Sequence, residues 1–283
     1  MNLAERELDR LIRLGWHLPK TDEHGVRNMT QLESNEISFP EEAYANFDDE
    51  SKSRDPWEVH RAEAISSLIR DSGLNYIWEI GAGDGSVSDI LEGSGIEVIC
   101  VEPIYNGARI LANKGNISFC STIHELKLPR DSIQAIGMFD VLEHISDPEE
   151  TLAEIHRVLV PGGLFICTVP AYNFLFSDFD IAIGHYRRYT KTSLRKLFPS
   201  EKFSEQSSRY LFAILVLPAL LLRTLPYKLG RRKNYVSIKE DKGNQIEILK
   251  KFSYLLTIWF QIEKKLKIPA GLSILGVWSK EGN

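Results

Sequence analysis

Short apolar runs alternate with amphipathic segments between residues 76 and 170, and this alternation constrains the fold more than any other feature of the sequence. Strands that alternate with helices form βαβ units, which predicts an α/β fold with a doubly wound, mostly parallel sheet. Such sheets bind ligands beyond the carboxyl ends of their strands. The runs that indicate strands are YIWEI (76–80), IEVICVE (96–102), ISFC (117–120), IQAIGMF (133–139) and LFICTVP (164–170).

The segment from Asp147 to Leu159 carries the clearest helix signals in the chain. Asp147 suits the N-cap, Pro148 suits the first helical position, and Glu150 follows the cap by three residues. The triplet P-G-G at 161–163 cannot continue a helix and marks its end. The sequence therefore predicts one helix between the last two strands of the alternating region.

The length of 283 residues suits one large domain, or one domain with a smaller appendage. Hydrophobic residues make up 43% of the chain and charged residues 26%, so the chain can bury a core. We expect an N-terminal helical or irregular extension over 1–55 and an α/β domain over 56–200. Residues 201–283 would form a helical insertion or lid with a final strand. Three cysteines lie in apolar runs and are predicted to be buried free thiols: Cys100, Cys120 and Cys167.

A glycine-rich turn, W-E-I-G-A-G-D-G-S, follows the first strand at positions 78–86. Glycine permits a tight turn and close approach of the backbone to a ligand. A dinucleotide-binding loop needs G-x-G-x-x-G, but Ser86 stands where the third glycine would fall. Glu79 would oppose a phosphate but attract the ammonium of an amino-acid cofactor. Glu102 ends the next strand, where an acid accepts hydrogen bonds from ribose hydroxyls. A generic surface loop explains each element alone, but less readily all of them in this order.

With GAGDG (81–85) and Glu102, the run FDVLEHISDPEETLAEIHRVLVPGGLFICTVPAY (139–172) resembles the class I S-adenosylmethionine-dependent methyltransferases. The similar sub-group carries D-x-L-E-H, R-V-L-x-P-G-G and V-P-A-Y, and the likeness covers about residues 57–200. It includes GHYRRYT (184–190), which is similar to G-H-x-R-R-Y-T of the same sub-group. The resemblance implies a Rossmann-like sheet of seven strands that binds S-adenosylmethionine. Relatives are commonly found near glycan and lipid-sugar biosynthesis.

The resemblance also implies which residues surround the cofactor. Where relatives supply an acid near the adenine amino group, this chain has Ser121, which stays a candidate through its backbone. Phe139 and Asp140 would lie beside the methionine end and the entrance for the substrate. The remaining implied contacts are Glu79, Gly81, Ala82 and Gly83 at the methionine part, Glu102 at the ribose and Pro103 at the adenine.

Methyl transfer to a hydroxyl benefits from a base, and His144 with its neighbour Glu143 is the leading candidate. An unperturbed imidazole titrates near pH ~6.5 and can accept a proton in the cell. The alternative is that Glu143 braces the loop while His144 only packs. His185 is the second candidate for the base. We expect no metal site, because Glu143 and His144 are adjacent and no His spacing is typical of a ligand set.

The substrate is predicted to meet a cationic, aromatic segment. Tyr172 lies in V-P-A-Y, while Tyr186, Arg187 and Arg188 lie in GHYRRY. Arginine suits the recognition of phosphate or carboxylate through paired hydrogen bonds. The alternative is a solvated loop, or an internal salt bridge to Asp178 or Asp180.

The stretch LFAILVLPALLL (211–222) is apolar all round, so its helix is either buried or in lipid. A basic stretch follows it, and a second apolar helix is expected over 252–268. Apolar helices flanked by basic residues suggest a membrane surface element, while the alternative is a lid or an oligomer interface. No window reaches the ~20 apolar residues of a membrane-spanning helix. The basic residues are Arg223, Lys228, Arg231, Arg232 and Lys233.

The sequence thus predicts S-adenosylmethionine-dependent O-methylation of a sugar, a lipid-linked glycan or a related small molecule. One alternative is a nicotinamide-dependent oxidoreductase or epimerase, which Ser86 and Glu79 disfavour. Another is a non-catalytic, membrane-associated cofactor-binding protein. A net charge of −5 argues against nucleic acid as a partner. The charged N-terminus has no signal-peptide core, so we expect a cytoplasmic protein with peripheral contact at the inner face of the membrane.

Overall fold

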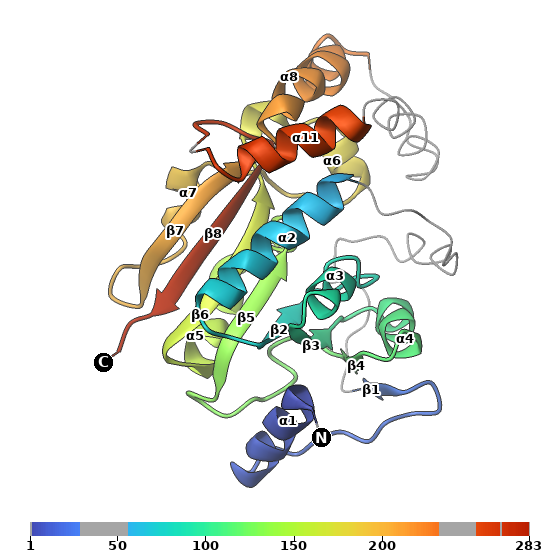
Figure 1. Ribbon diagram of the computed structural model, residues 1–283, viewed down its shortest axis with the longest axis vertical. Helices are drawn as coiled ribbons and strands as arrows, with labels where there is room; N and C mark the ends of the chain where they lie inside the picture. Colours follow the sequence, from blue (N-terminus) through green and yellow to red (C-terminus); the bar gives the residue numbers. More distant parts are fainter. Residues whose placement is uncertain (1, 29–55, 232–252, 267, 283) are drawn as a thin grey trace.

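Eight strands form a single open sheet in the computed structural model, which describes residues 2–28, 56–231, 253–266 and 268–282 (Figure 1). The neighbouring strands from β1 to β6 in the sheet run parallel to one another. Strand β8 runs antiparallel to both of its neighbours, β6 and β7. This confirms the mostly parallel α/β sheet, with one strand more than the seven expected. In order across the sheet the strands are β1 (Val26–Asn28), β4 (Ile117–Cys120), β3 (Glu97–Val101), β2 (Tyr76–Ile80), β5 (Ile133–Phe139), β6 (Leu159–Pro170), β8 (Ser273–Lys280) and β7 (Phe203–Leu211).

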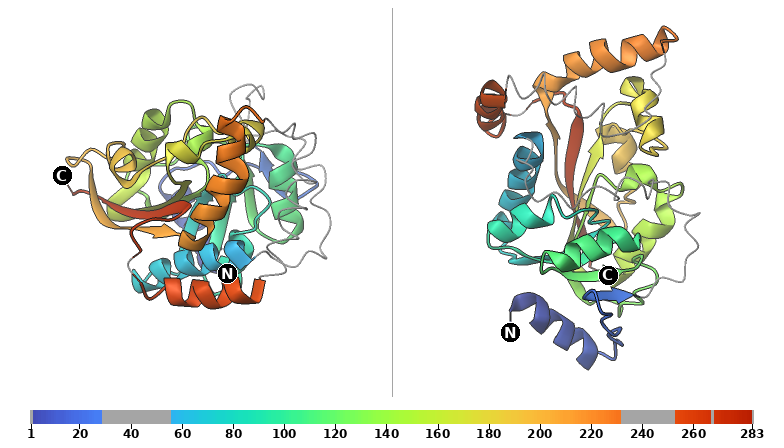
Figure 2. Two further views of the ribbon diagram at one scale, coloured as in Figure 1. Left: turned by 90° about the horizontal axis from the view of Figure 1, so that it is seen from above. Right: turned by 90° about the vertical axis from the view of Figure 1, so that its right-hand side faces the viewer.

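Helices cover both faces of the sheet, and the strands feed both layers because successive side chains point to opposite faces. Ile77 packs among the residues of one layer, while Trp78 packs with Trp16 and Phe119 in the other. The first layer contains α2 (Pro56–Asp71), α3 (Ser88–Gly93), α4 (Tyr105–Asn113) and α11 (Ser253–Glu263). The second contains α1 (Leu3–Arg13), α5 (Pro148–Val158) and α7 (Lys191–Arg195) (Figure 2).

Helix α5 begins and ends where its sequence signals place it. The Asp147 side chain accepts a hydrogen bond from the backbone N–H of Glu149 at 3.2 Å, and Pro148 is the first helical residue. Ile155 and Val158 are fully buried on its inner face. The P-G-G triplet was expected only to end the helix, but it already belongs to β6, which begins at Leu159. The extra residues fit through a register shift opposite Ile133 and Ala135.

The sheet takes strands from all three predicted segments of the chain. Strand β1 comes from the expected extension over 1–55, and β7 and β8 come from 201–283. The expected final strand is β8, which pairs with β6 from Leu164 to Pro170. Strand β7, FSEQSSRYL, was not expected because it is mostly polar; it forms an edge strand that is only partly buried. The C-terminal segment is therefore part of the same sheet as residues 56–200. Residues 29–55 lie outside the described part, as do Arg232 and Lys233.

A helical run from residue 213 to residue 228 crosses the end of the sheet near α6 (Asp178–Ala182) (Figures 1 and 2). The Thr224 hydroxyl donates to the carbonyl of Leu175 at 3.0 Å, and the Arg223 guanidinium lies 4.3 Å from the centre of the Phe179 ring. Consecutive parts of the run are η5 (Ala213–Leu215), α8 (Val216–Ala219), η6 (Leu220–Thr224) and α9 (Leu225–Lys228).

Helix α11 lies along the outer side of α2 and is held there by a buried contact between His60 and Glu263 (Figure 1). His60 Nε2 is 3.0 Å from a carboxylate oxygen of Glu263, and both side chains are almost fully buried. Glu263 also accepts the backbone N–H groups of Phe212 and Ala213 at 3.1 and 2.8 Å. Burial opposes ionisation of Glu263, but these donors hold its pKa below the ordinary value. One side chain thus ties α11, α2 and the start of the 213–228 run together.

None of the helices in the described ranges is long and apolar enough to cross a membrane. The three cysteines are free and buried, as expected from the sequence.

Candidate active site

The glycine turn connects β2 to α3 and is closed against the neighbouring strand. The N–H of Gly81 donates to the carbonyl of Val101 at 2.7 Å. Gly81, Gly83 and Gly85 all have positive φ angles, between 61° and 80°. A Cβ on Gly81 would lie 2.6 Å from a methyl group of Val141, so the turn packs directly on the chain after β5. Glycine is therefore required here by backbone conformation and by space.

Glu102 follows β3 and holds the turn in shape. One carboxylate oxygen accepts the N–H of Gly83 at 2.9 Å, and the other accepts the N–H of Ile104 at 3.0 Å. A carboxylate has about four acceptor sites, and these two bonds occupy two of them. Ser121 lies next to it and donates its N–H to the carbonyl of Glu102 at 3.3 Å. Pro103 is half-buried beside them. Carboxylate acceptors at this place fit the predicted ribose contact.

Glu79 points away from the turn surface and into the protein. Its carboxyl accepts the hydroxyl of Ser88 at 2.5 Å and is 2% exposed. Burial raises the pKa of Glu79 to about 8, and the Ser88 hydrogen bond lowers it only in part. Glu79 is therefore mainly protonated at neutral pH, which weakens the ionic attraction to an ammonium expected from the sequence. The geometry instead makes Glu79 a brace between β2 and the first turn of α3.

Asp140 follows β5 and is held between two elements. Its carboxylate accepts the Thr168 hydroxyl of β6 at 2.9 Å and forms an ion pair with Arg61 of α2. The φ angle of Asp140 is +57°, a left-handed conformation at the point where the chain leaves the strand. Phe139, just before it, is buried against Gly137. The structure thus brings the ends of β2, β3 and β5 to one edge, as the sequence predicted.

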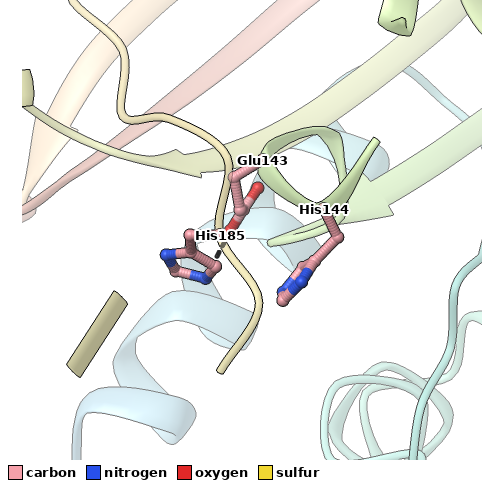
Figure 3. Close-up of side chains that lie close together, drawn as sticks. All are labelled: Glu143, His144 and His185. Atoms are coloured by element: carbon pink, nitrogen blue, oxygen red, sulfur yellow. Dashed lines mark ion pairs between the residues drawn. The ribbon is translucent and has the colours of Figure 1, made fainter. Parts of the chain in front are cut away.

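Glu143, His144 and His185 form a compact cluster next to that edge (Figure 3). Glu143 and His144 lie in the short turn η3 (Leu142–His144) after β5, while His185 lies in the loop after α6. Suitable ligand atoms of the three side chains all lie within 4.8 Å of one another. The ring centres of His144 and His185 are 4.7 Å apart at an interplanar angle of 75°. All three residues predicted to be catalytic are therefore neighbours.

Glu143 is fully buried and the two histidines are partly buried, which shapes the protonation of the cluster. Burial raises the pKa of Glu143 well above its usual range, and the Asp140 carboxylate raises it further. Burial, together with the neighbouring His185, lowers the pKa of His144 to about 4. His144 is therefore a neutral imidazole at physiological pH, whose nitrogen lone pair is free of a proton for chemistry.

Asp180 fixes the orientation of the His185 ring by contacting the nitrogen that does not face Glu143. One carboxylate oxygen is 2.9 Å from His185 Nδ1, and both oxygens accept hydrogen bonds from Arg188, at 2.7 and 3.1 Å. Burial opposes ionisation of Asp180, but His185 and Arg188 lower its pKa to about 2. The carboxylate also caps α6 by accepting the N–H of Ser177 at 2.9 Å. Arg188 therefore forms the internal salt bridge to Asp180 that was the alternative to recognition of the substrate.

The rest of GHYRRY docks on the backbone carbonyl groups of η3 and of the residues just after it. The N–H of Tyr186 donates to the carbonyl of Glu143 at 2.8 Å, and the Tyr189 hydroxyl donates to the carbonyl of Leu142 at 3.1 Å. Arg187 donates to the carbonyl of Ser146 at 2.6 Å. These bonds explain how D-x-L-E-H and GHYRRY meet in space.

Two of the predicted substrate-binding tyrosines differ in their surroundings. The ring of Tyr186 is half exposed, so it remains available to a ligand. Tyr172 instead stacks between Phe174 and Tyr210, with ring centres 5.2 and 5.3 Å away. Tyr172 thus belongs to an aromatic stack beside the loop, and its contact with substrate stays a prediction.

Sequence reasoning missed Arg61 and Thr168, which hold Asp140. Arg61 lies on an ordinary amphipathic helix, and no local pattern distinguishes it from a solvated arginine. Thr168 lies within an apolar strand run, where a hydroxyl among buried neighbours was the available signal.

Comparison with known proteins gives a consistent family. A family model described as a methyltransferase domain matches residues 57–212, more than half of the chain. A ubiquinone biosynthesis O-methyltransferase of Bradyrhizobium sp. is 32% identical over 118 residues, covering 40% of this chain and 45% of that protein. A candidate S-adenosylmethionine-dependent methyltransferase of Mycolicibacterium smegmatis is 27% identical over 143 residues, covering 48% and 54%. The chain thus spans about half the length of these curated relatives.

A solved structure shows the same fold. It is a candidate sarcosine dimethylglycine methyltransferase from Galdieria sulphuraria, with a TM-score of 0.50 and 15% identity. The match covers 79% of this chain and 86% of that chain. At this identity, the likeness speaks for the arrangement of strands and helices alone.

Proposed function

Because this chain belongs to the methyltransferase-domain family of class I S-adenosylmethionine-dependent methyltransferases, we propose that it methylates a hydroxyl group of a sugar, a lipid-linked glycan or a related small molecule. One observation carries the proposal. The glycine turn and Glu102, which suit the cofactor, share an edge of the sheet with a buried Glu-His-His cluster that suits proton chemistry. Val141 joins the two parts, because it contacts Gly81 and lies two residues before Glu143.

The residues present fit S-adenosylmethionine. The carboxylate oxygens of Glu102 are acceptors that suit ribose hydroxyls, and the glycines of the turn at 81–85 adopt a left-handed backbone that brings no side chain of their own to the site. Asp140 adds a carboxylate at the same edge, and its bond to Thr168 fixes its direction. When bound there, the cofactor would supply an electrophilic methyl group on a sulfonium sulfur.

Oxygen is the acceptor atom that best matches the cluster. A hydroxyl must lose its proton as it reacts, and groups that hold or direct that proton accelerate the step. His144 is neutral at physiological pH, and Asp180 fixes the direction of the His185 ring. The Bradyrhizobium relative is named an O-methyltransferase, which agrees with this choice.

A lipid-linked acceptor is supported by the outer surface of the 213–228 run. Ile214, Leu217, Leu221 and Leu225 recur at three- and four-residue spacing, and each is at least 42% exposed. Lys228 is exposed at the end of the same run. An apolar helical face with a basic end suits the boundary of an anionic membrane. The run also packs on the segment before His185, through Thr224 and Leu175, so a lipid-borne substrate would arrive next to the cluster.

Two measurements test the proposed function. Calorimetry with S-adenosylmethionine should show binding to the purified chain, whereas NAD should give none. Transfer of a labelled methyl group to lipid-linked sugar extracts should then be detected. Binding of NAD in place of S-adenosylmethionine would favour an oxidoreductase. Binding of S-adenosylmethionine with no transfer to any hydroxyl acceptor would favour a non-catalytic binding protein.

A substitution separates the cluster from the cofactor site. His144→Ala should lower turnover by about 100-fold or more, as loss of general-base assistance does, while cofactor affinity changes little. Glu150→Ala, on the exposed first turn of α5, is the matched control and should leave both unchanged. Equal turnover of His144→Ala and wild type would remove His144 from the chemistry.

A further inference from the structure

Glu143 is an unusual carboxyl group for the interior of a protein. It is fully buried, and neither carboxylate oxygen accepts a hydrogen bond from another residue in the described ranges. Buried carboxylates are normally paired, hydrogen-bonded or bound to a metal ion. The nearest guanidinium groups do not fill that role, because Arg61 is paired with Asp140 and Arg188 with Asp180. The position of Glu143 therefore suits a cation that takes the place of the carboxyl proton, and these side chains do not supply one.

His185 presents a ring nitrogen to this carboxylate in a defined way. Its Nδ1 is 2.9 Å from Asp180, so its Nε2 faces Glu143, at 3.7 Å from the nearer oxygen. That separation is too long for a hydrogen bond. An imidazole that binds a metal ion usually bonds its other nitrogen to a carboxylate, which fixes the ring and the tautomer. Asp180, itself anchored by Arg188, occupies that outer position.

We propose that Glu143, His144 and His185 bind a divalent metal ion, for which Zn²⁺ is the best match. Two imidazoles and one carboxylate with an open fourth position form a typical catalytic zinc site. Ligand atoms at ~2.1 Å from a tetrahedral ion lie about 3.4 Å apart. The three groups lie within 4.8 Å of one another, so small side-chain rotations would close the site (Figure 3). No His spacing along the chain predicted this site, because His185 reaches the other two residues only through the docking of GHYRRY on η3.

The ion would activate the acceptor, with His144 acting as a ligand in place of a base, and this role rests on the proposed function. A hydroxyl bound at the open position would lose its proton to solvent water more readily, because a metal ion lowers the pKa of a bound oxygen. That oxygen would then form a bond to the methyl carbon as the bond from carbon to sulfur breaks. The sulfur keeps the electron pair and leaves as a neutral thioether.

The test measures metal binding by the full chain without cofactor or acceptor. Protein treated with a chelator and dialysed is titrated with ZnCl₂ by calorimetry, and one ion per chain is expected. His185→Ala and Glu143→Gln should each weaken zinc affinity at least 100-fold. His17→Ala removes an exposed imidazole far from the cluster and should bind zinc as the wild type does. Far-ultraviolet circular dichroism and cofactor affinity establish that each variant is folded.

A melting experiment shows whether either variant has lost its fold and whether zinc stabilises it. Zinc should raise the Tm of the wild type and leave the Tm of Glu143→Gln unchanged, since that variant lacks the carboxylate ligand. A folded wild type that binds S-adenosylmethionine but no zinc would overturn the metal site and leave the proposed function standing. Zinc binding that survives unchanged in His185→Ala would overturn it as well. Zinc binding by a chain that transfers no methyl group would instead refute the proposed function alone.

Discussion

At the scale of single residues, the site depends on carboxylates that differ in their surroundings. Glu102 meets backbone N–H groups, Glu79 is buried on a hydroxyl, and Glu143 is buried among imidazoles. The sequence could place all three within or shortly after the ends of strands, because strand ends are readable from apolar runs. It could not show what each carboxylate touches, because the partners Ser88 and His185 arrive from other elements.

Glu102→Ala should weaken binding of S-adenosylmethionine by about 10- to 100-fold, which corresponds to the loss of hydrogen bonds to a charged group. The variant loses the expected ribose contact and also the bonds that hold Gly83 and Ile104. Calorimetric titration measures the affinity, with the exposed Glu150→Ala as control. An unchanged affinity would show that the ribose lies elsewhere.

Glu79→Gln should change how stability depends on pH. The folded pKa of about 8 lies above the ordinary 4.5, so the folded state keeps a proton that the unfolded state releases in between. The stability of the wild type is therefore full below pH ~4.5 and falls as pH rises toward 8, by up to about 4 kcal/mol. Urea unfolding at pH 5 and pH 8 should show a smaller fall for Glu79→Gln. Glu201→Gln, an exposed control, should follow the wild type, and equal falls for all three proteins would contradict the burial argument.

At the scale of elements, strands with apolar runs were predicted nearly to the residue, except for the early start of β6 at Leu159, whereas β1 and β7 were not predicted. Strand β7 is mostly polar because it lies at the edge of the sheet, where one row of side chains meets solvent. Strand β1 has only three residues, too few for any periodicity to register. The apolar stretch 211–222 was expected to be helical, but the helical run extends from 213 to 228 and contains the irregular turns η5 and η6, which were not expected.

The outer face of that run should decide membrane binding. Replacing Leu217, Leu221 and Leu225 with Ser should reduce flotation with anionic liposomes about tenfold or more, because each buried leucine contributes about 1.5–3 kcal/mol. These leucines are already exposed in the protein, so the fold should be retained. Leu14→Ser removes an exposed leucine outside the run and serves as control. Equal flotation of the triple variant and the wild type would exclude this face.

At the scale of the whole molecule, the predicted boundary at residue 200 divides a single sheet. Trp278 of β8 is buried and stacks on Phe198 with ring centres 4.0 Å apart, and β8 pairs with β6 over seven positions. The sequence suggested a separate segment because the alternation of strands and helices stops there. Sequence periodicity reports local structure, and it carries no information about which distant strand a segment joins.

A chain that ends at residue 200 should therefore fail to fold cooperatively. It would lose the burial of Ile274, Leu275, Val277 and Trp278, at about 1.5–3 kcal/mol for each side chain. The sum is comparable to the 5–15 kcal/mol that stabilises a typical domain. Circular dichroism during urea titration should show a broad, non-cooperative change for the short chain and a single transition for the full chain. A sharp transition in the short chain would restore the boundary at residue 200.

The position of β8 between β6 and β7 also sets an order of events during synthesis. The edge of β6 that pairs with β8 stays unpaired until residues 273–280 have left the ribosome. Strand β6 itself emerges about a hundred residues earlier. An unpaired edge on a nascent polypeptide invites association with other strands. Expression of this protein should therefore depend on chaperones that shield growing chains, and slow translation should lower its soluble yield.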